Sequence, residues 1–168
     1  MKRNVELWKE AGYILEKIGN GVLLTTAAEG EVNTMTIGWG TMGIQWGRPI
    51  FIAFVRESRY TKELLTRNPE FTVNVPYGEL DKSILRICGT RSGRDMDKIK
   101  ELGLTLEAGE SVSVPGIREL PLTLECKVIY QQDQLPEAIC SAAMERYYPN
   151  GDFHTAYYGE ITGAYVIE

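Results

Sequence analysis

The segment Arg56–Thr61, with the sequence RESRYT, combines two arginines with two hydroxyl side chains. It follows an apolar run typical of a buried strand and precedes a pattern typical of a short helix. The first turn of a helix offers free backbone N–H groups and a partial positive charge, and a guanidinium group can bind a phosphate with two hydrogen bonds. We therefore expect a phosphate-binding cradle here, with Ser58 as the N-cap of the helix. A capped surface helix with solvated arginines would show the same pattern.

A second stretch, Asn33–Gly40 with the sequence NTMTIGWG, favours contact with a flat ring. Small and hydroxylated side chains dominate it, and they allow a ring to approach the backbone of a strand closely. The N–H and C=O groups of that backbone could match a uracil-like ring edge, and Trp39 could line the ring pocket. The alternative is a strand that is buried on both faces and contributes a core tryptophan.

The third stretch, Cys88–Asp95 with the sequence CGTRSGRD, has the composition of an anion-binding turn. It contains two glycines, two hydroxyl side chains and two arginines, and it precedes a helix that we expect to begin near Asp95. Successive backbone N–H groups in such a turn can bind an anion. The alternative is a connection between two helices that is simply rich in turn-forming residues.

Apolar periodicity predicts the elements that must position these three stretches. Helical spacing is found in residues 7–18, 58–68, 80–88, 96–102 and 136–146, and Gly89 is well placed to cap the third of these helices. Strand-like runs are found in residues 22–26, 31–40, 49–55, 71–75, 122–130 and 155–167, and the first two are expected to pair as a hairpin. Regular alternation of strand and helix and a GxGxxG motif are both missing. An antiparallel barrel, closed or partly open, is therefore expected rather than a Rossmann sheet.

Length and composition indicate one globular domain that spans residues 1–168. The chain is 43% hydrophobic and 24% charged, and it shows no break in composition. Its net charge of -5 argues against binding to nucleic acid or to an anionic membrane surface. The first residues are too charged for a secretory signal, and no apolar run is long enough to span a bilayer, so we expect a cytoplasmic protein.

The three cysteines and the single histidine do not suggest a metal site. Cys88, Cys126 and Cys140 are far apart in the sequence and form no pair with the spacing of metal ligands. Their odd number, without an export signal, favours reduced thiols. Cys126 lies on a strand pattern and Cys140 on the expected helix over residues 136–146, and both are expected in the core, whereas Cys88 belongs to the third stretch.

Taken together and in order, five motifs resemble the pattern of the flavin reductase-like, FMN-binding split-barrel family. They are NTMTIGWG, VRESRYT, FTVNVP, CGTRSGRDMDK and HTAYYGEI, and the resemblance extends from about Val22 to Glu168. The nearest resemblance is to the flavoredoxin-type branch. It implies a mainly β fold with flanking helices, in which a Greek-key antiparallel sheet forms a split barrel. It also implies a homodimer with one FMN per subunit near the dimer interface.

The resemblance also implies roles for individual residues. The residues expected beside the isoalloxazine and the ribityl chain are Asn33, Thr34, Met35 and Thr36, followed by Ile37 and Trp39. The residues expected to hold the phosphate are Arg56, Ser58, Arg59 and Thr61, together with Tyr60 in the same turn. Those expected at the ring edge are Cys88, Gly89, Thr90 and Ser92. His154 would lie near the exposed face of the flavin, where a nicotinamide could stack, although a lone histidine can equally be structural.

Two functions share all of these residues. An NAD(P)H-dependent flavin reductase would pass a hydride from NADH or NADPH to N5 of the flavin, and it would need no side-chain nucleophile. An FMN electron carrier would instead be reduced by a redox partner protein. The pocket over the flavin distinguishes them, because a nicotinamide would be blocked if Trp39, His154 and the segment Tyr147–Phe153 closed over the ring. A split barrel that has lost cofactor binding is the third possibility.

Overall fold

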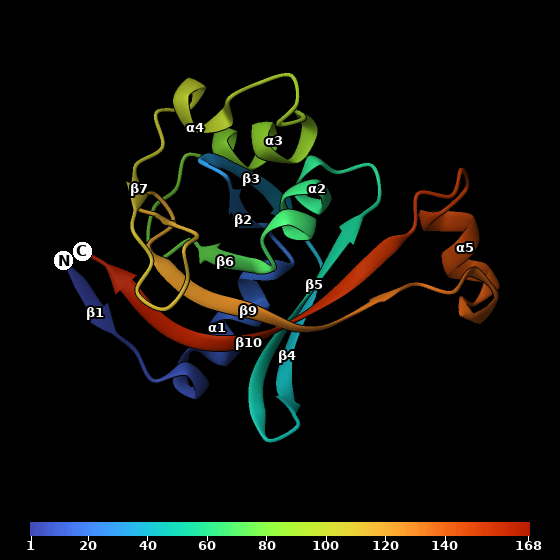
Figure 1. Ribbon diagram of the computed structural model, residues 1–168, viewed down its shortest axis with the longest axis horizontal. Coiled ribbons are helices and arrows are strands. Elements are labelled where there is room, and N and C mark those ends of the chain that lie inside the picture. The colour runs from blue at the N-terminus through green and yellow to red at the C-terminus, as the bar shows by residue number, and fades with distance from the viewer.

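The computed structural model describes residues 1–168, and one curled antiparallel sheet dominates it (Figure 1). The sheet has eight strands in the order β3-β2-β6-β9-β10-β5-β4, and β1 pairs with the far part of β10. A separate two-stranded ladder joins β7 and β8. The strands are β1 (Lys2–Asn4), β2 (Val22–Ala28), β3 (Glu31–Ile37), β4 (Gly40–Gln45), β5 (Arg48–Arg56), β6 (Glu70–Val75), β7 (Leu106–Glu107), β8 (Gly116–Ile117), β9 (Leu122–Asp133) and β10 (His154–Ile167). The mainly β, antiparallel architecture agrees with the sequence prediction.

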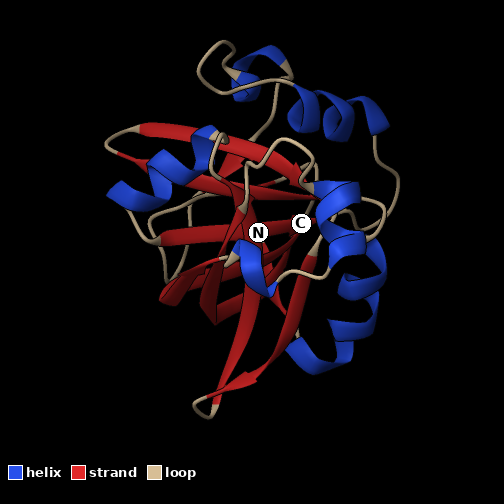
Figure 2. Ribbon diagram, turned by 90° about the vertical axis from the view of Figure 1, so that its right-hand side faces the viewer, coloured by secondary structure: helices blue, strands red, loops and turns tan.

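Five α-helices and one 3₁₀ helix flank the sheet. They are α1 (Leu7–Ile18), α2 (Tyr60–Arg67), α3 (Lys82–Thr90), α4 (Lys98–Glu101), η1 (Pro136–Ala138) and α5 (Ser141–Tyr147). Figure 2 shows that these helices lie around the edges of the strand layer rather than between strands. None of them combines the length and the apolar character that crossing a bilayer would require.

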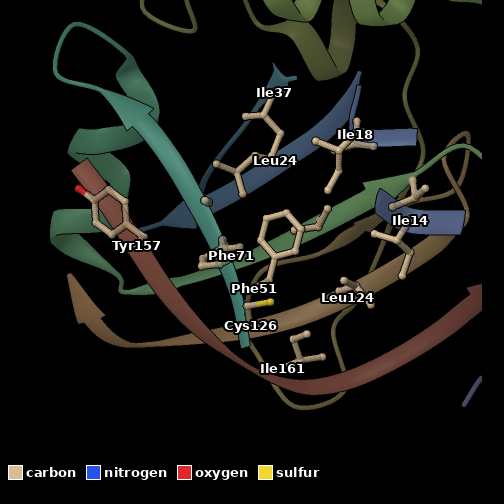
Figure 3. Close-up of a cluster of buried hydrophobic side chains, with 14 of the residues drawn as sticks. Ile14, Ile18, Leu24, Ile37, Phe51, Phe71, Leu124, Cys126, Tyr157 and Ile161 are labelled. Carbon is tan, nitrogen blue, oxygen red and sulfur yellow. The ribbon is translucent and has the colours of Figure 1, made fainter. Parts of the chain in front are cut away.

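The main core lies inside the curled sheet, where α1 supplies its apolar stripe (Figure 3). Ile14 and Ile18 of α1 are buried against strand residues such as Leu24, Phe51 and Leu124. An amphipathic helix and the inner face of a curled sheet both have apolar surface to bury, so each stabilises the other. The predicted helix over residues 7–18 has the observed bounds.

A glycine allows the long strands to bend around this core. The pairing of β9 with β10 shifts register between Tyr158 and Gly159. A Cβ atom at Gly159 would lie 2.5 Å from the ring of Phe71 and 2.8 Å from Cys126 Cβ. Only glycine therefore lets the Phe71 ring pack at this bend, where the sheet curves.

A second, smaller core fixes α3 against the outside of β2. It joins Leu23 of β2 with Ile84 and Cys88 of α3, and with Ile117 and Leu120 from the segment that contains β8. This cluster holds the third stretch identified in the sequence, Cys88–Asp95, beside β3. Figure 1 shows α2, α3 and α4 gathered at this end of the sheet.

The structure corrects the predicted strand over residues 31–40. Strand β3 ends at Ile37, and Gly40 begins β4, which pairs with β5 at the other end of the sheet order. A Cβ atom at Gly40 would lie 2.8 Å from Phe51 Cζ, so the crossing depends on the absence of a side chain there. The chain then reverses at Trp46 and Gly47, which both have positive φ, as a two-residue hairpin turn requires.

Three predictions about helix ends were wrong. Arg59, not Ser58, is the N-cap residue of α2, because the Ser58 hydroxyl is bound to Asp152, far along the chain. Gly89 does not terminate α3, which continues to Thr90. The helix that was expected to begin near Asp95 is α4, which begins at Lys98.

The predicted helix over residues 136–146 is two separate elements. The 3₁₀ helix η1 ends at Ala138, and α5 begins at Ser141. Cys140 lies between them with an extended backbone and is exposed, so its expected place in the core was wrong. Cys126 is fully buried, as predicted.

Candidate functional site

Two cavities adjoin beside β3 and share Met35 and Arg59 as lining residues. The first, which we call the aromatic cavity, has a volume of about 210 Å³ and is lined by Met35, Thr36, Ile37, Gly38, Trp39, Phe54, Arg56, Arg59 and His154. The second, the cationic cavity, has a volume of about 320 Å³ and is lined by Asn33, Met35, Ser58, Arg59, Tyr60, Thr61, Thr90, Arg91, Ser92, Gly93, Arg94, Asp95 and Lys98. All three stretches identified in the sequence therefore meet at one place.

The cationic cavity contains a buried positive charge without an acidic partner. Lys98 is 3% exposed, and its ammonium group donates only to the carbonyl oxygen of Arg91, at 3.3 Å. Burial lowers the pKa of Lys98 from 10.5 to about 8, an effect that Arg59 reinforces and Cys88 opposes. An uncompensated buried cation costs free energy, and an anionic ligand would offset that cost.

The start of α2 presents a hydroxyl group to the same cavity. Asn33 Nδ2 donates to Thr61 Oγ1 at 3.1 Å, and the Thr61 hydroxyl makes no further hydrogen bond within the chain. Its proton is therefore free for a ligand. The Ser58 hydroxyl and backbone N–H instead donate to the Asp152 carboxylate, at 2.7 and 2.9 Å. Ser58 lines the cavity, but both of its donors are already engaged.

Arg59 fixes the boundary between the two cavities. Its guanidinium group donates to the carbonyl oxygens of Gly89 and Cys88 near the end of α3, at 3.1 and 3.2 Å. Carbonyl groups at a helix C-terminus carry partial negative charge, so this is a favourable place for a cation. Burial lowers the pKa of Arg59, and the nearby Asp152 opposes that change.

His154 lies in the aromatic cavity between aromatic rings. Its ring centre is 5.1 Å from that of Trp39, which in turn contacts Tyr147 edge to face at 5.0 Å. His154 Nδ1 lies 2.8 Å from the Tyr148 hydroxyl. Burial and the neighbouring Arg56 lower the pKa of His154 to about 4, although Asp152 acts in the opposite direction. The imidazole is therefore uncharged at neutral pH.

Arg56 supports the segment that leads into His154. Its guanidinium group donates to the carbonyl oxygens of Asp152 and Tyr147, at 2.8 and 3.0 Å, and it lies over the Tyr148 ring. Two charge-assisted hydrogen bonds to backbone atoms hold residues 147–152 against the end of β5. None of the residues from Tyr147 to Phe153 lines the aromatic cavity itself.

Comparison with known proteins identifies the family of this fold and site. The model of the flavin reductase like domain matches residues 15–168. The chain belongs to this family. Its fold is the split barrel of flavin reductase-like proteins, as predicted.

Two flavoredoxins of known structure are similar to the chain. The flavoredoxin from Methanosarcina acetivorans is 29% identical, with a TM-score of 0.68 over 88% of this chain and 68% of that one. The flavoredoxin of Desulfovibrio vulgaris (Miyazaki F) is 26% identical, with a TM-score of 0.68 over 88% of this chain and 69% of that one. The predicted resemblance to the flavoredoxin branch is confirmed.

A relative from Archaeoglobus fulgidus, described as an uncharacterized protein, is 33% identical over 129 residues. The match covers 77% of this chain and 62% of that protein, so this chain spans about three fifths of its relative's length.

Most of the residues that the sequence assigned to cofactor binding line one of the two cavities. Met35, Thr36, Ile37, Trp39, Arg56, Arg59 and His154 line the aromatic cavity. Asn33, Met35, Ser58, Arg59, Tyr60, Thr61, Thr90 and Ser92 line the cationic cavity. Arg56, expected at the phosphate, lines the aromatic cavity, and Thr90 and Ser92, expected at the ring edge, line the cationic cavity.

Thr34, Cys88 and Gly89 line neither cavity. The Thr34 hydroxyl is fully buried and lies 3.0 Å from Thr25 Oγ1. Cys88 is fully buried in the smaller core, and burial raises the pKa of its thiol although Lys98 and Arg59 oppose this. Gly89 takes part only through its carbonyl oxygen, which accepts from Arg59.

Sequence reasoning missed several lining residues, of which Lys98 matters most. A signal was present, because Lys98 lies four positions before Leu102, on the apolar side of the predicted helix over residues 96–102. A lysine at such a position must reach solvent or an anion. Phe54 had no comparable signal, because it lies within a continuous apolar run.

Proposed function

We propose that this chain binds FMN, with the phosphate in the cationic cavity and the isoalloxazine in the aromatic cavity. The observation that carries the proposal is the buried Lys98 ammonium group, which has no acidic partner in the chain. Arg59 and Arg91 line the same cavity, as does Arg94, whose charge is paired with Glu63, and the only carboxylate in the lining is that of Asp95. This excess of positive charge suits a phosphate, and the adjoining cavity has the aromatic lining that suits a flat ring.

The donor set fits the parts of FMN in order along β3. Lys98, the Thr61 hydroxyl and Arg59 would hold the phosphate. Met35 and Arg59 line both cavities, so they would lie beside the ribityl chain. The backbone from Thr36 to Gly38 and the side chain of Trp39 would lie along the ring. The comparison with solved structures supports flavin binding as a family property, because the two similar structures described above are flavoredoxins.

We further propose that the chain is an NAD(P)H-dependent flavin reductase. Bound FMN would supply the hydride-accepting N5 atom, and the protein would position the two rings. The segment Tyr147–Phe153 does not line the aromatic cavity, and Trp39 is 41% exposed at its edge. The aromatic residues therefore leave room at the ring face, which supports the reductase over a carrier that receives electrons from a redox partner protein.

Anaerobic mixing tests both parts of this proposal. Purified protein should quench the fluorescence of added FMN, and the FMN-loaded protein should lose its oxidised-flavin absorbance on mixing with NADH or NADPH, at a rate of about 1 s⁻¹ or faster. Protein that ignores excess FMN would contradict flavin binding. Protein that binds FMN but is bleached by neither nucleotide would exclude the reductase and leave the electron carrier.

A homodimer is also part of the proposal, on the family resemblance and on the apolar residues that the folded chain leaves exposed. Ile44 is 71% exposed and Trp46 is 65% exposed, both near the tip of the β4–β5 hairpin. Neighbouring exposed apolar side chains of this size are typical of protein interfaces.

A further inference from the structure

Tyr148 and His154 form a buried polar pair at the wall of the aromatic cavity. Tyr148 is 6% exposed and His154 is 7% exposed, and the Tyr148 hydroxyl lies 2.8 Å from His154 Nδ1. The segment that carries Tyr148 has its own supports, because its ring stacks on Phe153 and lies under the Arg56 guanidinium group. Both partners are therefore held in place independently of any ligand.

The hydrogen bond has one direction that satisfies both partners. The Tyr148 hydroxyl makes no other hydrogen bond in the chain, so its proton has His154 Nδ1 as its acceptor. If Nδ1 carried the proton instead, the tyrosine hydroxyl proton would be left without a partner in a buried position, which costs free energy. Nδ1 is thus the acceptor, and the neutral imidazole must carry its proton on Nε2.

His154 Nε2 has no hydrogen-bond partner within the chain, and His154 lines the aromatic cavity. The histidine is also fixed through its backbone, since His154 pairs with Arg56 in the register of β10 and β5, and its backbone N–H donates to Gln134 Oε1 at 3.1 Å. The second ring nitrogen is therefore a positioned donor without an acceptor.

We propose that Tyr148 is a positioning residue that holds His154 as the Nε2–H tautomer, and that this N–H donates to an uncharged carbonyl oxygen of the molecule that enters the aromatic cavity over the flavin. The carboxamide of a nicotinamide has such an oxygen. The choice of ligand rests on the proposed reductase function, whereas the tautomer of His154 does not.

Charged groups around the pair are consistent with a neutral donor. Arg56 lies on the neighbouring strand, Asp152 precedes His154 on its own segment, and Arg59 lines the same cavity. Burial and Arg56 disfavour a second proton on the imidazole. Asp152 favours it, but the Asp152 carboxylate is already bonded to Ser58.

The chain contains one histidine, so nitrogen NMR reports on His154 without assignment. Ligand-free, ¹⁵N-labelled protein at pH 7 should give a protonated-type shift for Nε2 and an unprotonated-type shift for Nδ1. In Tyr148→Phe the two shifts should move toward each other, with the ratio of Nε2–H to Nδ1–H falling at least about fivefold, the equivalent of one ordinary hydrogen bond.

The matched control is Tyr147→Phe. The Tyr147 hydroxyl makes no hydrogen bond, so this variant should keep the wild-type shifts. A wild-type protein with the proton on Nδ1, a cationic imidazole at pH 7, or unchanged shifts in Tyr148→Phe would each overturn the assignment.

Kinetics with FMN-loaded protein test the ligand. Tyr148→Phe should raise the KM for the nicotinamide by the factor by which NMR shows the Nε2–H fraction to fall, while the Kd for FMN and the limiting rate of flavin reduction stay within about twofold of wild type. An unchanged KM would overturn the carbonyl contact. If wild-type protein is reduced by neither nucleotide, the reductase proposal fails on its own, and the NMR result still decides the tautomer.

Discussion

Two buried ionisable side chains, Lys98 and His154, lie in adjoining cavities and differ in their charge at neutral pH. Lys98 keeps a lowered but still basic pKa of about 8, so it is mostly charged at neutral pH without a carboxylate beside it. His154 has a pKa of about 4 and is neutral. The fold thus offers a charged donor at one end of the site and an uncharged donor at the other. FMN is complementary to this arrangement, because it has a dianionic phosphate at one end and a neutral ring at the other.

At the level of the residue, Lys98→Met should separate the contribution of the phosphate to FMN affinity from the contribution of the ring. Loss of one charge-assisted contact costs about 1.5–3 kcal/mol, so the Kd for FMN should rise roughly ten- to hundredfold. Riboflavin, which has no phosphate, should bind as it does to wild type. Fluorescence titration of both ligands measures the difference. Lys100→Met, an exposed lysine on the same helix, is the control and should change neither Kd.

Equal weakening of both ligands in Lys98→Met would contradict the assignment of the cationic cavity. The same variant has a second readout, in ligand-free protein. Because the folded-state pKa of Lys98 is lowered, the unfolded chain binds more protons between about pH 8 and 10.5, and folding stability gains with rising pH in this window. That contribution should disappear in Lys98→Met.

At the level of the element, Glu125 attaches the loop between β7 and β8 to the sheet. This fully buried carboxylate on β9 accepts from the backbone N–H groups of Glu110 and Ser111, at 2.7 and 2.6 Å, from the Ser111 hydroxyl and from Tyr165 on β10. A single side chain thus satisfies donors from a loop and a strand. Burial alone would raise the pKa of Glu125, but these hydrogen bonds outweigh it and lower the pKa.

Glu125→Gln should therefore destabilise the fold without touching the site. An amide places an N–H₂ group where donors converge, so at least one hydrogen bond to a charged acceptor is lost and we expect a loss of roughly 3 kcal/mol in the free energy of unfolding. Urea unfolding at pH 7 measures it. Glu110→Gln, whose exposed carboxylate lies 3.8 Å from Lys2, should change stability by less than about 0.5 kcal/mol.

The pH dependence of Glu125 has a definite sign. Its folded-state pKa is lowered, so its stabilising contribution is complete above the unfolded value near 4.5 and is lost as pH falls through the folded value. The stability difference between wild type and Glu125→Gln should narrow on acidification below about pH 4.5. A difference that stays constant to low pH would mean that the carboxylate charge does not hold the loop.

The local parts of this fold could be predicted from the sequence, and the long-range parts could not. Periodicity predicted α1 with its observed bounds, and the pattern of residues 58–68 predicted a short helix, which is α2. The Ser58–Asp152 contact joins segments 94 residues apart, and no local pattern indicates it. The place of Arg56 likewise depends on carbonyl groups of a distant segment. The prediction that Cys140 lies in the core was wrong because a local sequence pattern does not show whether another element covers the residue.

At the level of the whole molecule, two extensions project from the curled sheet. Figure 1 shows the β4–β5 hairpin below it and the outer parts of β9 and β10, with α5, to one side. The hairpin tip carries Ile44 and Trp46, and Trp46 contacts Tyr130 of β9 edge to face at 6.1 Å. Tyr130 in turn contacts Tyr158 of β10 at 5.0 Å. Trp46 is thus held in a defined position by aromatic contacts although it is exposed, and aromatic side chains of this kind are enriched at protein interfaces.

Trp46→Lys should therefore weaken the proposed homodimer. Burying a large apolar side chain stabilises an interface by about 1.5–3 kcal/mol, so the dimer dissociation constant should rise roughly ten- to hundredfold. Sedimentation velocity over a range of micromolar concentrations should show a dimer for wild type and a shift toward monomer for the variant. Trp8→Lys is the matched control, because Trp8 is 54% exposed but belongs to α1 rather than to the β4–β5 hairpin, and this change should leave the dimer intact. A wild-type protein that is monomeric throughout would contradict the homodimer, and a dimer unaffected by Trp46→Lys would place its interface away from the hairpin. The second result would leave the hairpin tip free for a different partner, and a redox partner protein would then be the occupant to test, because the same apolar surface cannot serve both at once.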